Sequence, residues 1–119
     1  MNIGILGQGF VGSAIREGLK SHYKILTYDL DSSKCNSSLL EVTEKSDIIF
    51  VCVPTPMRKD GSCDTRILEN AIENIYNKFK DLKKETAPIL IIKSTIPPGT
   101  TQIINDKYSD MTVLFSPEF

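Results

Sequence analysis

Short continuous apolar runs alternate along the whole chain with segments in which apolar residues recur every three or four positions. Continuous runs are typical of strands covered on both faces, and the longer period is typical of amphipathic helices. The runs predict strands at residues 3–6, 23–28, 48–53, 88–93 and 112–116. The periodic segments predict helices at residues 10–19, 37–45, 65–82 and 100–108.

This alternation predicts an α/β fold in which parallel strands are joined by helical crossovers. We expect a Rossmann-like, doubly wound parallel sheet of about five strands with helices on both faces, in the spatial order 2-1-3-4-5. Ligands bind such sheets at the carboxyl ends of the strands, here near the first and third strands. Residues 1–119 are predicted to form a single domain, because the sequence contains no repeats, linkers or low-complexity segments.

The turn after the first strand reads Gly7-Gln8-Gly9-Phe10-Val11-Gly12, and Asp29 ends the second strand. This order of strand, glycine turn, helix, strand and acid is the fingerprint of dinucleotide binding. Gly7 allows the tight turn, Gly9 leaves room for a pyrophosphate, and Gly12 lets the helix pack close to the strand. The positive end of the helix dipole receives the phosphate charge, and Asp29 can accept hydrogen bonds from ribose hydroxyls. The alternative is an ordinary glycine-rich turn between a strand and a helix.

Composition narrows the class of protein. Hydrophobic residues make up 40% of the chain and charged residues 24%, which is normal for a soluble globular domain. The formal net charge is -1 and the basic residues are scattered, so no nucleic-acid partner is expected. Without a long apolar run or a signal peptide, we expect no membrane contact and a cytoplasmic location. Cys35, Cys52 and Cys63 show no metal-binding spacing, so no metal site is expected.

Three further segments follow the ends of predicted strands, where such sheets bind ligands. They are Val53-Pro54-Thr55-Pro56, Lys93-Ser94-Thr95-Ile96-Pro97-Pro98-Gly99-Thr100 and Ser116-Pro117-Glu118-Phe119. Each segment taken alone is equally well explained as a capped loop. Together they favour a functional site.

With the glycine turn and Asp60-Gly61-Ser62-Cys63-Asp64, these segments resemble the NAD-binding domain of the UDP-glucose/GDP-mannose dehydrogenase family. The resemblance covers the whole chain in order. It implies an enzyme that uses two NAD⁺ to oxidise the C6 alcohol of a nucleotide sugar to a carboxylate. We expect the substrate to be UDP-glucose, which would be converted to UDP-glucuronate for polysaccharide precursors.

The resemblance also implies roles for particular residues. The implied cofactor-binding residues are Gly7, Gly9, Phe10, Val11, Gly12, Asp29, Lys34, Val53, Pro54, Thr55 and Thr95. Asp29 would bind the adenosine ribose with Lys34 alongside, and Thr55 would lie along the cofactor. Thr95 would sit near the nicotinamide and the reacting carbon. Glu118 would act as the acid/base when water attacks the enzyme-bound intermediate.

Two departures from the family pattern affect these expectations. Only residues 30–47 separate the second and third strands, where the family commonly has a longer stretch with one more strand. The family's second domain, which holds the nucleophilic cysteine and binds the nucleotide sugar, is expected to be missing from this chain. The alternative function is therefore a non-catalytic NAD-binding module. A homodimer is possible, although family dimers rely largely on a central helix outside this chain.

Overall fold

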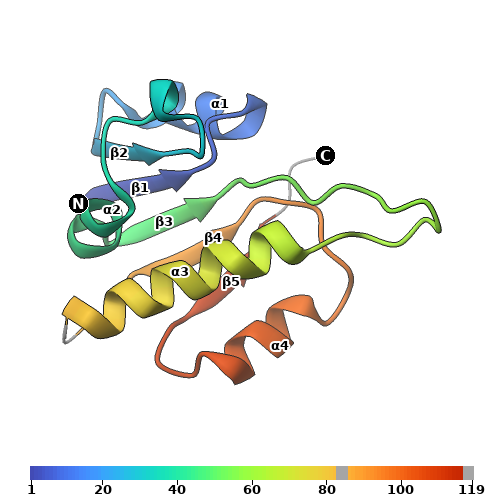
Figure 1. Cartoon of the computed structure of the whole chain (residues 1–119). Coiled ribbons are helices and arrows are strands. Elements are labelled where there is room, and N and C mark those ends of the chain that lie inside the picture. Colours follow the sequence, from blue (N-terminus) through green and yellow to red (C-terminus); the bar gives the residue numbers. More distant parts are fainter. Residues whose placement is uncertain (83–85, 117–119) are drawn as a thin grey trace.

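The computed structural model describes residues 1–82 and 86–116, with only the backbone of Phe10. The elements are β1 (Asn2–Leu6), α1 (Phe10–Leu19), β2 (Lys24–Tyr28), the 3-10 turn η1 (Ser32–Lys34), α2 (Leu39–Lys45), β3 (Ile48–Val51), α3 (Arg66–Leu82), β4 (Ile89–Ile92), α4 (Thr100–Lys107) and β5 (Val113–Phe115). Strands and helices alternate along the described chain (Figure 1), as the apolar pattern predicts.

The strands form one sheet in the order β2-β1-β3-β4-β5, and all neighbouring pairs are parallel. The predicted fold class and strand order are therefore confirmed. The chain moves outward from β1 to β2 and then returns past β1 to β3. Because such crossovers are right-handed, this reversal places α1 on one face and the later helices on the other. The carboxyl ends of β1 and β3 meet at the reversal, where Leu6 pairs with Val51.

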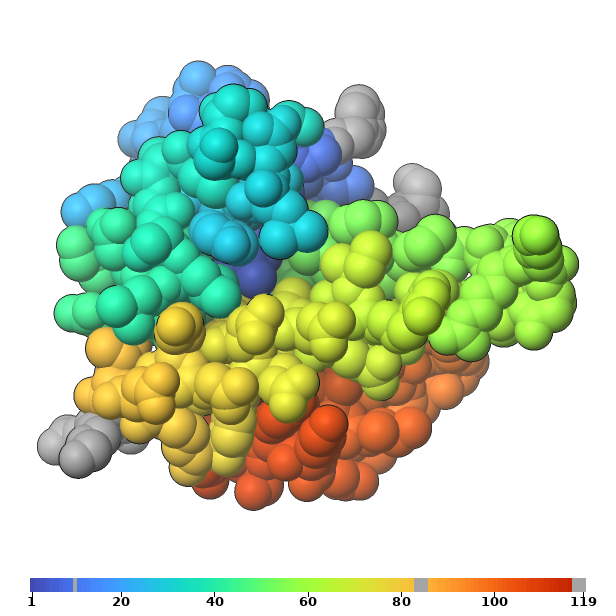
Figure 2. All heavy atoms as spheres, in the orientation of Figure 1, coloured from blue at the N-terminus to red at the C-terminus, as the bar shows by residue number. Residues whose placement is uncertain are grey.

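Helix α3 carries most of the packing on its side of the sheet. Its residues Leu68, Ile72, Ile75 and Phe79 are buried at the helical spacing that the sequence predicts. Figure 2 shows this helix between the segment containing α2 and the orange to red segment containing α4. The helix begins at Arg66, whose N–H donates to the Asp64 carboxylate at 3.1 Å. Asp64 thus satisfies the first N–H of the helix, although Thr65 occupies the position directly before it.

Several elements are shorter than predicted, for local reasons. Helix α2 begins at Leu39 instead of residue 37, because Ser38 caps it and forms a reciprocal capping box with Glu41. Strand β3 ends at Val51, two residues early, as the chain turns toward Pro54, which lacks a ladder N–H. The turn η1 was not predicted. It is held by the Asp31 side chain, which accepts a hydrogen bond from the Ser33 N–H.

The outer edge of β2 is paired with a side chain instead of a further strand. The Thr27 N–H donates to the Asn36 side-chain oxygen at 2.8 Å, and the Asn36 side-chain amide donates to the Ile25 carbonyl at 3.1 Å. The Asn36 N–H in turn donates to the Thr27 hydroxyl at 3.0 Å. Unpaired strand edges are exposed to intermolecular pairing. Asn36 therefore satisfies this edge within the short connection between β2 and β3.

Candidate cofactor-binding site

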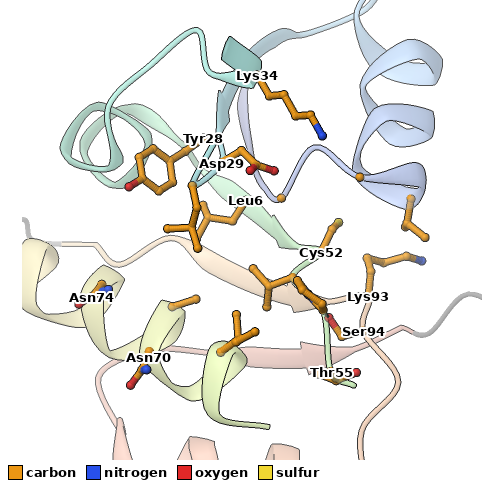
Figure 3. Close-up of a pocket in the computed structure, with 18 of the residues that line it drawn as sticks. Leu6, Tyr28, Asp29, Lys34, Cys52, Thr55, Asn70, Asn74, Lys93 and Ser94 are labelled. Atoms are coloured by element: carbon orange, nitrogen blue, oxygen red, sulfur yellow. Dashed lines mark hydrogen bonds between the residues drawn. The ribbon is translucent and has the colours of Figure 1, made fainter. Parts of the chain in front are cut away.

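A cavity of about 830 Å³ lies along the carboxyl ends of β1 to β4. Figure 3 shows side chains from both halves of the chain around it. The glycine turn, the segment after β2, the segment after β3, the first turns of α3 and the loop after β4 all contribute to the lining. This is the crevice that the strand order predicts, since the reversal of the chain separates the loops there.

Two of the motif glycines are required by the fold itself. Gly7 has φ 91, and a Cβ atom there would lie 2.6 Å from the Cys52 carbonyl oxygen. A Cβ atom at Gly12 would lie 1.8 Å from the Gly7 carbonyl oxygen. A side chain at either position would therefore push α1 or β3 away from β1.

Gly9 differs, because nothing in the protein requires a glycine there. Its φ is -76, which any residue adopts, and a Cβ atom would meet no heavy atom within 4 Å. Gly9 lines the cavity and stands at the start of α1, where no side chain caps the helix and the first turn has no acidic residue. Open space beside an uncapped helix N-terminus fits a phosphate group. The residues present therefore fit the pyrophosphate of a dinucleotide.

Asp29 lies beside the glycine turn and is held in place by backbone donors. One carboxylate oxygen accepts from the Gln8 N–H at 2.6 Å and the other from the Asp31 N–H at 2.9 Å. These bonds, from Asp31 first and Gln8 second, and the nearby Lys34 charge hold the pKa of the Asp29 carboxyl below its usual value. The ionised carboxylate borders the cavity and keeps lone pairs for additional donors.

The loops after β3 and β4 are tied together across the other end of the cavity. The Thr55 hydroxyl donates to the Thr95 carbonyl at 2.7 Å, and the Ser94 hydroxyl donates to the Val53 carbonyl. The Cys63 thiol lies 3.6 Å from the Thr95 carbonyl oxygen. These bonds fix the backbone of both loops. The Thr95 hydroxyl has no hydrogen-bond partner in the described part of the chain, so it can serve a ligand.

Most of the predicted cofactor-binding residues meet at this cavity. Those that line it are Gly7, Gly9, Val11, Asp29, Lys34, Val53, Pro54, Thr55 and Thr95. Gly12 is not in the lining and instead allows the close packing of α1 described above. The side chain of Phe10 and the whole of Glu118 lie outside the described residues.

Sequence reasoning missed two polar residues in the lining. Asn70 and Asn74 lie on α3 and border the same cavity as Asp29. Their spacing of four residues was a usable signal, because it places both on one face of the predicted helix. The prediction of that helix used only its apolar positions, so both asparagines were assigned to its solvent-facing side.

Among residues 1–82 and 86–116, no three His, Cys, Asp or Glu side chains are grouped so that they could hold a metal ion. The same residues contain no helix with the length and apolar character needed to cross a membrane.

Comparison with known proteins identifies the family. Residues 34–119 match the model of the UDP-glucose/GDP-mannose dehydrogenase family, NAD binding domain. The chain belongs to this family. Its cofactor is accordingly NAD, and the resemblance inferred from the sequence motifs is confirmed. A UDP-N-acetyl-D-mannosamine dehydrogenase of Methanocaldococcus jannaschii is 44% identical over 80 residues, which cover 62% of this chain and 18% of that protein.

Longer matches cover this family member from end to end. A UDP-glucose 6-dehydrogenase of Campylobacter jejuni is 27% identical over an alignment of 150 positions, gaps included. This alignment covers 100% of this chain and 37% of the relative. The solved GDP-mannose dehydrogenase of Pseudomonas aeruginosa superposes with a TM-score of 0.84 at 23% identity. That superposition covers 100% of this chain and 36% of the enzyme, and it supports the fold alone. The chain thus spans well under half the length of these relatives.

Proposed function

We propose that the cavity binds NAD, and that the chain is the cofactor-binding part of a nucleotide-sugar 6-dehydrogenase. The observation that carries this proposal is Gly9, whose missing side chain serves no other residue and opens onto the cavity at the start of α1. Family membership supplies the cofactor, and the geometry of the site supports where it binds.

The proposed placement runs along the carboxyl edge of the sheet. The pyrophosphate lies on the turn from Gly7 to Gly12, where backbone N–H groups of Phe10 and Val11 are available at the helix start. The adenosine end of the cavity is formed by Tyr28, Asp29, Leu30 and Lys34, with the Asp29 carboxylate accepting from ribose hydroxyls.

The nicotinamide end of the cavity is formed by residues 53–55 and 93–95. NAD⁺ accepts a hydride from an alcohol carbon when it is bound. In this placement the Thr95 hydroxyl can orient the reacting groups. The hydrogen bonds donated by Thr55 and Ser94 hold the two loops together. Val53 and Pro54 provide apolar surface that excludes water from this end.

The substrate is proposed to be a nucleotide sugar oxidised at C6, with UDP-glucose as the first candidate. This rests on the relatives, whose names include UDP-glucose, GDP-mannose and UDP-N-acetyl-D-mannosamine dehydrogenases. The role of Glu118 as acid/base, a homodimeric state and a cytoplasmic location stay predictions.

The second candidate function is NAD binding without catalysis. The nucleophile that the family uses lies outside the motifs found here, and two of the three thiols serve local structure. Cys35 accepts from the Asp29 N–H at 3.0 Å, and Cys63 approaches the Thr55 and Thr95 carbonyls. Measuring NADH production with NAD⁺ and UDP-glucose separates the two functions, because a module that only binds NAD produces no NADH.

The substitution Gly9→Ala tests the placement of NAD. Since a Cβ atom at Gly9 has free space, we expect an unchanged thermal midpoint but at least roughly a tenfold loss of NAD affinity by calorimetry. Gly18→Ala is the matched control, because Gly18 also lies in α1 with nothing within 4 Å and does not line the cavity. Equal NAD affinity in the Gly9→Ala variant and the wild type would rule out pyrophosphate binding at this turn.

A further inference from the structure

The face that α3 turns toward the cavity carries an unusual pair of residues. Ile67, Asn70, Ala71 and Asn74 line the cavity, so two amides lie among apolar side chains on successive turns of one helix. Figure 3 shows both asparagines on α3, across the pocket from Tyr28 and Asp29.

The amides of both asparagines are free of partners within the described residues. Both side chains are exposed, and neither forms a hydrogen bond in the described part of the chain. Asparagine is a poor helix former, since its side chain competes for backbone hydrogen bonds. Asn77 on the same helix is also exposed, but Asn70 and Asn74 differ from it because they border the cavity, where their free amides are available to a ligand.

The cavity beside these amides suits a flat apolar group. Leu30 is 88% exposed and Ile67 is 39% exposed, although both line the cavity. Tyr28 and Leu39 line the same region. These apolar side chains line a concave cavity, and such a lining suits the apolar faces of a ligand.

We propose that Asn70 and Asn74 recognise the edge of adenine that carries the 6-amino group. This inference rests on the proposed NAD site. With the ribose at Asp29, the base attached to it lies against the apolar lining, and the two amides border that lining. An asparagine amide offers an acceptor beside a donor, which matches the 6-amino donor beside a ring-nitrogen acceptor of adenine. The two asparagines thereby favour binding of an adenine dinucleotide over analogues in which the 6-amino group and the neighbouring ring nitrogen cannot form these hydrogen bonds.

Calorimetry with NAD and with nicotinamide 1,N6-ethenoadenine dinucleotide tests this inference. The etheno bridge removes the 6-amino donor and the N1 acceptor and leaves the rest of the cofactor intact. We expect the wild-type chain to bind NAD about tenfold more tightly than the etheno analogue, since two neutral hydrogen bonds are at stake. In the Asn70→Ala/Asn74→Ala variant, NAD binding weakens by about the same factor, etheno binding changes little, and the preference disappears.

Asn77→Ala is the matched control, because Asn77 lies on the same helix but does not line the cavity. It should leave both affinities unchanged. Alanine is a better helix former, so none of these substitutions should unfold α3, and circular dichroism checks this. A wild-type chain without preference, or a preference that survives in the double variant, would overturn the inference while leaving NAD binding intact. A wild-type chain that does not bind NAD would overturn the proposed function as well.

Discussion

The two ends of the cavity are built by different means. At the end where we place the adenosine, an ionised carboxylate and exposed apolar side chains face the cavity, and the carboxylate is oriented by the N–H groups of Gln8 and Asp31. At the end where we place the nicotinamide, the hydroxyls of Thr55 and Ser94 donate hydrogen bonds to carbonyls of the facing loop. The first end presents groups for binding, whereas the second uses its side chains to hold the backbone in place.

This difference predicts a strong preference for NAD over NADP, set at the adenosine end. A 2′-phosphate near the Asp29 carboxylate, at about 5 Å and an effective dielectric of about 20, costs on the order of 3 kcal/mol per unit charge. That corresponds to roughly a hundredfold in affinity, reduced by salt and by any pairing with Lys34. Calorimetry with both cofactors measures the ratio.

Substitution at Asp29 should narrow that ratio. Asp29→Ala should weaken NAD binding and bring the two cofactors closer. Asp29→Asn removes the charge and keeps an acceptor oxygen for one of the two N–H groups, because Gln8 and Asp31 donate to different carboxylate oxygens. It therefore disturbs the turn less than Asp29→Ala does while it removes the same charge. An NAD/NADP ratio that neither substitution changes would mean that Asp29 does not contact the ribose.

Thr55→Val should affect only the nicotinamide end. The substitution removes the hydrogen bond to the Thr95 carbonyl, and we expect a several-fold loss of NAD affinity, as for one neutral hydrogen bond of about 1 kcal/mol. ADP, which lacks the nicotinamide half, should bind as it does to the wild type. Thr112→Val, outside the cavity, is the control. A parallel loss of ADP affinity would show that the two ends are not independent.

The smallest expected effect concerns acid stability. The pKa of Asp29 is lower in the folded chain than in the unfolded chain, so its ionised form stabilises the fold. That contribution is present above the unfolded pKa of about 3.9 and is lost as the pH falls through the lower folded value. Urea unfolding should therefore show a larger loss between about pH 7 and pH 3 for the wild type than for Asp29→Asn. The pKa values of Asp31 and Asp60 are also lowered, but both residues are present in the wild type and in the Asp29→Asn variant. Their contributions therefore cancel when the two proteins are compared.

Sequence patterns predicted the fold and many of the residues that line the cavity, because both depend on local signals. Apolar runs mark the buried strands, and the glycine turn with Asp29 marks the point where a parallel sheet reverses. The hydrogen bond from Thr55 to the Thr95 backbone was not predicted, since it depends on how two loops after different strands meet. Asn70 and Asn74 were missed because periodicity separates apolar from polar positions and does not reveal which polar positions face a cavity.

The side chain of Asn36 has a consequence for how the chain behaves in concentrated solution. Its amide occupies the hydrogen-bonding sites of Thr27 and Ile25 that an incoming strand from another molecule would use. The Asn36 side chain thus protects the outer edge of β2 from strand pairing between molecules. Removing the amide at this position would free the Thr27 N–H and the Ile25 carbonyl, while the Thr27 carbonyl would stay bonded to the backbone N–H groups of Asn36 and Ser37. This edge of the sheet would then be more open to pairing between molecules.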